Sequence, residues 1–180
     1  MVAHTVIRQE VAATVEDTFD LIHDYPRRLE WDTMLRRAFT VGDVPPGPGV
    51  EAVCSARWRF GGLTFRTRYV TFRRPDLAAV SLVDQPPLFA GWAASIRHRT
   101  LSSTRSEVVY PLTFSCLPAS AARVVEPVAL AAFSRETQRR LRALAEFLEA
   151  PGKASGSPHV CDPPASGPGP TRRTWCRCCG

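Results

Sequence analysis

His98 is the residue of this sequence whose chemistry suits it best to proton transfer. It lies in the alternating stretch GWAASIRHRTL, where Trp92, Ile96 and His98 share one face. An imidazole on such a face could donate a hydrogen bond to a ligand oxygen, or act as a general acid or base. No carboxylate shares that face nearby in sequence to orient the ring, so we favour a core or rim histidine bonded to the backbone. His98 is the one catalytic candidate.

Two tyrosines, Tyr69 and Tyr110, fall in similar alternating stretches, and their hydroxyl groups could orient a ligand. The body of the chain contains no nucleophile elbow, no phosphate-binding loop and no credible metal cluster. We therefore expect neither a metal ion nor a cofactor.

The cysteines concentrate at the C-terminus, where residues 151–180 hold four of the six. A zinc site or a prenylated terminus would use such residues, but the CRCC spacing does not match paired zinc ligands, and Arg177 stands where a prenylation motif needs cysteine. The segment is rich in proline and glycine and has no hydrophobic periodicity, which is typical of disorder. We therefore divide the chain into a domain at residues 1–150 and a disordered tail at residues 151–180.

The composition indicates an ordinary globular domain, because 44% of the 180 residues are hydrophobic. No apolar run approaches the ~20 residues of a membrane span, and the N-terminal residues lack the layout of a secretory signal. We expect a cytoplasmic protein with reduced thiols and no stable membrane insertion. Half of the formal net charge of +6 lies in residues 151–180, so the mild excess in the domain does not indicate nucleic-acid binding.

The stretch VEDTFDLIHDYPRRLEWD predicts a short helix that ends sharply. Thr14 is placed to cap it together with Asp17, and apolar residues then recur at helical spacing. Pro26 ends the helix because it lacks an N–H and disfavours helical backbone at the preceding residue. Trp31, in a short second turn after this stop, must bury its ring against another element.

From residue 53 to residue 116 the apolar period is two, which predicts half-buried antiparallel strands. The strands are expected in AVCSARWRF, LTFRTRYVTF, DLAAVSLVD, GWAASIRHRTL and SEVVYPLTFSCL, with a two-residue hairpin at Gly61 and Gly62 between the first two. Pro111 in the last strand indicates an edge strand or a bulge. The outward face collects arginines that we interpret as a solvated surface: Arg57, Arg59, Arg66, Arg68, Arg97 and Arg99.

A long helix is predicted after Pro127, which suits a first turn. Apolar residues recur along it at threes and fours, while arginines that include Arg140 are assigned to its other sides. Some 22 residues at 1.5 Å each reach roughly 33 Å, enough to cross a sheet.

This order of elements resembles the START-like helix-grip superfamily, SRPBCC, which includes polyketide cyclases/dehydrases and lipid-transport proteins. The resemblance covers residues 5–149 and rests on VAATVEDTFDLIHDYPRRLEWD, on the strand count and on FSRETQRRLRALAEFLEA. It implies an α+β fold in which a curved antiparallel sheet grips the long C-terminal helix, with two short helices after the first strand. Members of the superfamily hold apolar or aromatic small molecules in a cavity between sheet and helix.

Candidate ligand-binding residues follow from this resemblance, because their phase points at such a cavity. They are Trp31, Trp58, Phe65, Tyr69, Trp92, His98, Tyr110, Phe114 and Phe133, joined by Phe60, Ile96 and Leu130.

Three functions remain open on these residues. The preferred one is a binding or carrier protein for a hydrophobic small molecule (lipid, polyketide or aromatic), because the residues in phase with His98 are overwhelmingly apolar. The second is a polyketide cyclase or aromatase acting on a poly-β-keto chain. The third is a protein-interaction module that uses the arginine face. The sequence leaves the identity of the ligand and the oligomeric state open.

Overall fold

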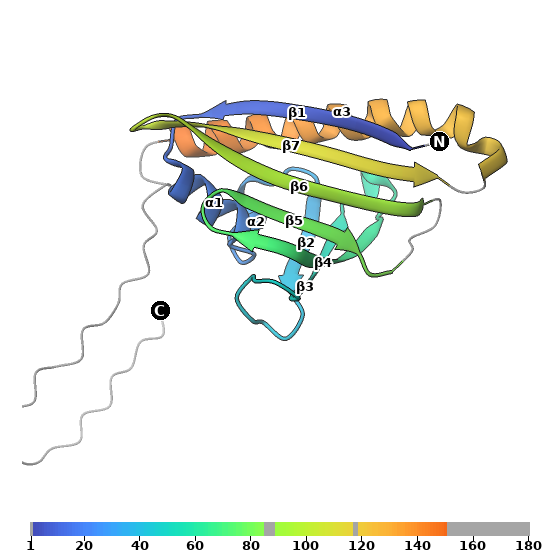
Figure 1. Cartoon of the computed structure of the whole chain (residues 1–180), viewed down its shortest axis with the longest axis horizontal. Helices are drawn as coiled ribbons and strands as arrows, with labels where there is room; N and C mark the ends of the chain where they lie inside the picture. The colour runs from blue at the N-terminus through green and yellow to red at the C-terminus, as the bar shows by residue number, and fades with distance from the viewer. Residues whose placement is uncertain (1, 85–88, 117–118, 151–180) are drawn as a thin grey trace, which may run out of the picture.

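The computed structural model describes residues 2–84, 89–116 and 119–150. Within these residues, seven antiparallel strands form one curved sheet in the order β1-β7-β6-β5-β4-β3-β2, and the long helix α3 runs along β1 and β7 (Figure 1). The predicted α+β helix-grip fold is therefore confirmed. The disordered tail predicted at residues 151–180, with its zinc and prenylation alternatives, lies outside the described residues.

The strands are β1 (Ala3–Val11), β2 (Leu35–Thr40), β3 (Glu51–Ala56), β4 (Thr64–Arg73), β5 (Leu77–Leu82), β6 (Phe89–Ser102) and β7 (Arg105–Cys116). The helices are α1 (Val15–His23), α2 (Arg28–Trp31) and α3 (Ala119–Glu149), and a 3-10 helix spans Trp58–Phe60. None of the helices in the described residues combines the length and apolar character needed to cross a membrane.

The core lies between the concave face of the sheet and α3. Alternate residues of β7, Val108 and Leu112 among them, are buried there against Leu144 of α3. This alternation places every second residue of each strand on the same face, so the periodicity of the sequence decides which side chains reach the interior.

Helix α1 begins and ends where the sequence predicts. The Asp17 amide donates to the Thr14 hydroxyl at 3.1 Å, and Asp24 follows the last turn in an extended conformation. Phe19 is buried, and Trp31 of α2 is buried as well. The sharp stop between the helices turns the chain so that α2 lies near the C-terminal half of α3 (Figure 1).

The hairpin prediction around Gly61 and Gly62 was wrong in detail. Strand β3 ends at Ala56, because Trp58 and Phe60 turn into the 3-10 helix, and both glycines adopt positive φ values that close this turn. The Trp58 side chain is 75% exposed, with the Arg36 guanidinium 4.5 Å above its ring.

Two of the arginines assigned to the outward strand face consequently do not lie on a strand. Arg57 donates to the Leu35 carbonyl at 3.1 Å, and Arg59 donates to the Thr33 carbonyl at 2.9 Å.

Pro111 does not mark an edge strand or a bulge. Strand β7 is an interior strand between β1 and β6, and Pro111 lies opposite Val6 in a register that continues on both sides without a shift. On the other side β7 pairs Leu112 with Ala94 and Val109 with Arg97, again in one register.

Helix α3 begins at Ala119, upstream of Pro127, so Pro127 lies inside the helix and not in its first turn. A proline there removes one intrahelical hydrogen bond, but the alanine-rich residues before it favour helix and continue it. The inward face of α3 was predicted correctly for Thr137, Leu141 and Leu144, which are all buried.

Candidate functional site

A cavity of about 90 Å³ lies between the sheet and α3. Aromatic and aliphatic side chains from three strands and from α3 form its apolar walls: Phe65, Trp92, Ile96, Leu112 and Phe133. Its other end is polar, and side chains from α1, the turn after it, α2, β4 and α3 line that end: His23, Tyr25, Arg28, Tyr69 and Arg140. The cavity therefore has two chemically distinct ends.

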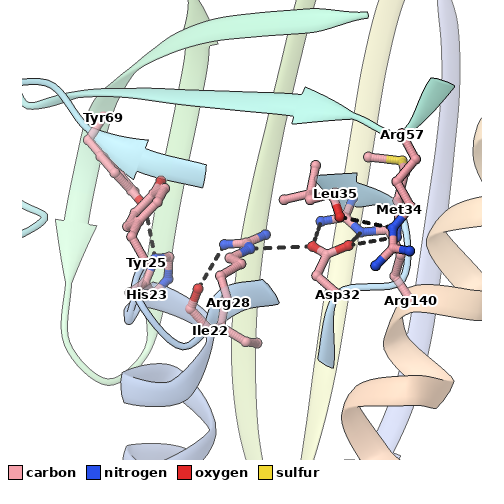
Figure 2. A network of polar contacts seen from close by, with 10 residues as sticks. All are labelled: Ile22, His23, Tyr25, Arg28, Asp32, Met34, Leu35, Arg57, Tyr69 and Arg140. Carbon is pink, nitrogen blue, oxygen red and sulfur yellow. Dashed lines mark hydrogen bonds and ion pairs between the residues drawn. The ribbon is translucent and has the colours of Figure 1, made fainter. Parts of the chain in front are cut away.

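Three of the polar side chains form a hydrogen-bonded chain. The Tyr69 hydroxyl lies 2.9 Å from His23 Nδ1 and 2.9 Å from the Tyr25 hydroxyl (Figure 2). His23 is the last residue of α1 and Tyr25 follows it in the turn, so the sharp stop of the helix directs both side chains toward β4. His23 Nε2 has no hydrogen-bond partner within the described residues.

Burial keeps these three groups uncharged near neutral pH. It lowers the pKa of His23 well below the ordinary value of 6.5, and the positive charge of Arg28 adds to this effect. It raises the pKa of Tyr69 to about 12 and the pKa of Tyr25 well above its ordinary value. Near neutral pH the His23 imidazole is therefore an uncharged hydrogen-bonding group, and the two hydroxyls keep their protons.

A charged cluster lies beside this chain, with Arg28 between the two (Figure 2). Asp32, whose side chain is 0% exposed, accepts hydrogen bonds from Arg140 Nε at 3.0 Å and Arg140 Nη2 at 2.6 Å. Arg28 Nε lies 3.4 Å from the same carboxylate, and Arg28 Nη1 donates to the Ile22 carbonyl at 2.7 Å. The cluster joins α2 to α3 across the interior.

Asp32 is ionised in this environment. Burial alone would raise the pKa of Asp32, but the guanidinium groups of Arg140 and Arg28 outweigh burial and hold the pKa below its ordinary value.

Two clefts flank the cavity and share lining residues with it. One, of about 350 Å³, lies under the loop that follows β2 and shares His23 and Tyr25 with the cavity. The other, of about 230 Å³, lies between the 3-10 helix and α3, shares Phe65 and Phe133 with the cavity, and contains Glu136. These shared side chains lie between the cavity and the two clefts.

The structure brings together half of the twelve residues that the sequence nominated. Six of the predicted ligand-binding residues line the cavity: Phe65, Tyr69, Trp92, Ile96, Tyr110 and Phe133. Trp31 and Phe114 are buried in the core and do not line this cavity.

Trp58 lies outside the cavity, because the chain leaves the strand before it. Phe60 lines the cleft beside α3, and Leu130 packs against the core. That the six lining residues bind a ligand stays a prediction.

His98 does not line the cavity. Its ring packs against Phe19 at 5.3 Å between centroids, and burial lowers its pKa to about 4 although Asp76 opposes this shift. Within the described residues both ring nitrogens lack a hydrogen-bond partner, so the expected backbone bond to the ring is also wrong. Helix α1 packs on His98 through Phe19.

Four residues at the polar end were not predicted from the sequence: His23, Tyr25, Arg28 and Arg140. The helical spacing could have placed two of them on the inward faces of their helices. His23 follows Phe19 by one helical turn, and Arg140 follows the inward-facing Thr137 by three residues. Arg140 was assigned to the other sides of its helix by residue type, and no position was predicted for Arg28. Among the described residues, no group of three histidine, cysteine or acidic side chains is placed to hold a metal ion.

A comparison with protein families matches residues 2–149 to the family described as polyketide cyclase / dehydrase and lipid transport. No curated protein matches the sequence. Among solved structures, a START superfamily protein from Mycobacterium smegmatis is 15% identical, with a TM-score of 0.68 over 81% of this chain and 97% of that one.

Two further structures are named as aromatase/cyclases. The Zhui aromatase/cyclase from Streptomyces sp. R1128 is 16% identical, with a TM-score of 0.68 over 83% of this chain and 94% of that one. The di-domain ARO/CYC BexL from the BE-7585A biosynthetic pathway is 14% identical, with a TM-score of 0.67 over 83% of this chain and 50% of that one. Identities this low show a common fold and leave the chemistry to the site.

Proposed function

Because this chain belongs to the polyketide cyclase / dehydrase and lipid transport family, we propose that it binds a small, mostly apolar molecule in the cavity between its sheet and α3. The ligand has one polar end, which lies against Tyr25 and Tyr69. Its apolar part packs against the aromatic side chains of Phe65, Trp92 and Phe133.

The observation that carries this proposal is the division of the cavity into an aromatic wall and a polar end. Binding sites for small molecules combine apolar walls with a few polar groups that fix orientation. The neutral hydroxyls of Tyr25 and Tyr69 bond each other, so one of them uses its hydrogen in that bond. The other can donate to a carbonyl, hydroxyl or carboxylate oxygen of a ligand when His23 Nδ1 donates to Tyr69.

The volume restricts the size of the ligand. Cavities that enclose drug-sized molecules measure about 300–1,000 Å³, whereas this one measures about 90 Å³. A ligand with a single ring suits the enclosed space, and a longer molecule would extend into one of the flanking clefts. The volume thus favours a small aromatic ligand over a long lipid chain.

A second candidate function is that of a polyketide cyclase or aromatase, as named for Zhui and BexL. The observation in its favour is His23, which is neutral near pH 7, is oriented by Tyr69 and keeps Nε2 without a partner among the described residues. Such an imidazole can remove a proton from carbon next to a carbonyl group, while a tyrosine hydroxyl donates to the carbonyl oxygen. His23 replaces His98 as the candidate for this role.

The interaction-module alternative has less support. Arg66 and Arg68 of the outward arginine face both pair with Glu51, so part of its charge is already neutralised.

Native mass spectrometry of the purified protein is the direct test of ligand binding, followed by calorimetric titration with a neutral one-ring probe such as cinnamamide. Ile96→Trp, which fills the cavity, should abolish binding, and Trp58→Ala, outside the cavity, should leave it unchanged. Absence of a bound ligand together with absence of probe binding would reject the proposal.

A poly-β-keto cyclisation assay separates the two candidate functions. Robust turnover by the wild type that is lost in His23→Phe and kept in His98→Phe would show that the protein is a cyclase. That result would reject the proposal that it only binds its ligand. We expect no turnover in the wild type, as a binding protein requires.

A further inference from the structure

The polar end of the cavity contains more positive than negative charge. Arg28 and Arg140 both line the cavity, and their side chains are 9% and 10% exposed. Asp32 is the carboxylate that pairs with both of them. Two cations therefore share one anion in a region with almost no access to water.

The other ionisable groups that line the cavity do not balance this excess. Burial raises the pKa of Tyr25, Tyr69 and Cys54, so these groups stay neutral near pH 7, and burial keeps His23 uncharged. Glu136 lines the neighbouring cleft, and its ion pair is to Arg139, at 3.6 Å. The cluster around Asp32 thus keeps a net charge of about +1 by this count.

Uncompensated charge in a protein interior is costly, because the low dielectric neither solvates nor screens it. The carbonyl of Ile22 offsets part of this cost at Arg28, since it accepts a hydrogen bond at 2.7 Å. A carbonyl dipole does not supply a full negative charge, whereas an anionic ligand in the cavity would supply one.

Counted over the described residues, Arg28 is the arginine of this cluster that has unused hydrogen-bond donors. Arg140 directs two N–H groups at Asp32, whereas Arg28 makes a single long contact with this carboxylate, at 3.4 Å. A guanidinium carries five N–H donors, and the two bonds given for Arg28 use two of them. Its Cζ lies 5.9 Å from the centre of the Tyr25 ring, so an oxyanion beside Arg28 would also lie close to the tyrosine hydroxyls.

We propose that the ligand of this cavity is a small organic carboxylate whose charged group binds beside Arg28 and whose apolar part lies against the aromatic wall. This inference rests on the proposed binding function and assigns the chemical class of the ligand. Arg28 determines specificity for the anion, and Asp32 positions the two arginines.

The test compares two probes of matched shape, trans-cinnamate and cinnamamide, which differ in charge. Calorimetric titration of the full chain at pH 7 should give at least tenfold tighter binding of cinnamate, as one charge-assisted hydrogen bond in a buried site supplies. Arg28→Gln should reduce this ratio to about one, because it weakens the binding of cinnamate more than the binding of cinnamamide. Arg28→Lys keeps the positive charge, so it should retain a preference for cinnamate over cinnamamide. If the glutamine variant does not fold, the lysine variant still tests the role of the charge, and a lysine variant that binds both probes equally would contradict it.

Two controls separate a buried site from general attraction to a basic surface. Arg36→Gln removes an exposed arginine that stacks on Trp58 outside the cavity, and it should not change either affinity. The preference for cinnamate should also persist at about 1 M NaCl, where the Debye length is about 3 Å. A preference that disappears in salt, or that survives Arg28→Gln, would overturn the assignment to Arg28.

The inference and the proposed function fail in different ways. Equal binding of the two probes to the wild type would overturn the anionic ligand and leave the binding function standing. Binding of neither probe, and no co-purified molecule, would overturn both.

Discussion

Replacing Asp32 by asparagine should lower the free energy of unfolding by about 3–5 kcal/mol, the cost of removing one partner from a buried ion pair. The Asp32 side chain is 0% exposed and accepts from Arg140 at 3.0 and 2.6 Å and from the Met34 amide at 3.2 Å. Asparagine has nearly the same volume, so no cavity contributes to the loss. It removes the carboxylate that, within the described part of the chain, pairs with both buried guanidinium groups.

The chain offers a matched control at the surface. Asp20 also binds one arginine through both carboxylate oxygens, at 2.6 and 2.7 Å from Arg74, but these side chains are 53% and 54% exposed. Asp20→Asn should therefore leave the denaturation midpoint nearly unchanged, because exposed ion pairs are screened by water.

Urea denaturation followed by far-UV circular dichroism measures both variants, and equal m-values would show that only stability changed. Because the arginines lower the pKa of Asp32 in the folded protein, its contribution is complete above the ordinary value of 3.8 and is lost as the pH falls below it. Asp32→Asn should remove this part of the acid sensitivity. If Asp32→Asn lowers the free energy of unfolding by less than about 1 kcal/mol, or by as little as Asp20→Asn does, then Asp32 does not stabilise the buried arginines as described.

Three further outcomes are expected. Tyr69→Phe should cost about 1–3 kcal/mol in urea denaturation, because it leaves buried His23 Nδ1 without its partner; no loss would contradict the hydrogen-bonded chain. Burial lowers the pKa of His98, so stability should fall as the pH decreases from 6.5 to about 4, and His98→Phe should fall less steeply in the same pH series. Trp58→Ala should cost about 1 kcal/mol or less, and a thermal or urea midpoint shifted as far as for a core tryptophan would contradict its exposed position.

The sequence predicted those parts of the fold that depend on local pattern. The cap at Thr14, the stop after α1 and the strands from β4 to β7 follow from residue spacing alone. Strand β2 was not predicted, because Arg36 and Arg37 are adjacent and both exposed, which breaks the alternation of a half-buried strand. Resemblance to a superfamily supplied the arrangement of these elements, which periodicity does not encode.

The apolar walls of the candidate site were predictable and its polar end was not. Phe65, Trp92 and Phe133 were nominated by phase, and phase is what places them at the cavity. A buried arginine is rare unless it is paired, so residue type argues for the surface. Arg140 is buried because it pairs with Asp32. The residues that surround Arg140 in the sequence of α3 do not indicate this partner.

The pairing of Asp32 with Arg140 has a consequence for the time at which the site forms. The two residues are 108 positions apart, and β1 likewise pairs with β7, with Ala3 opposite Phe114. Contacts between such distant segments form late, since closing long loops costs entropy before any contact offsets it. During synthesis the ribosome must therefore release nearly the whole domain before the charged cluster and the cavity beside it can assemble, and until then Arg28 and Asp32 remain in water.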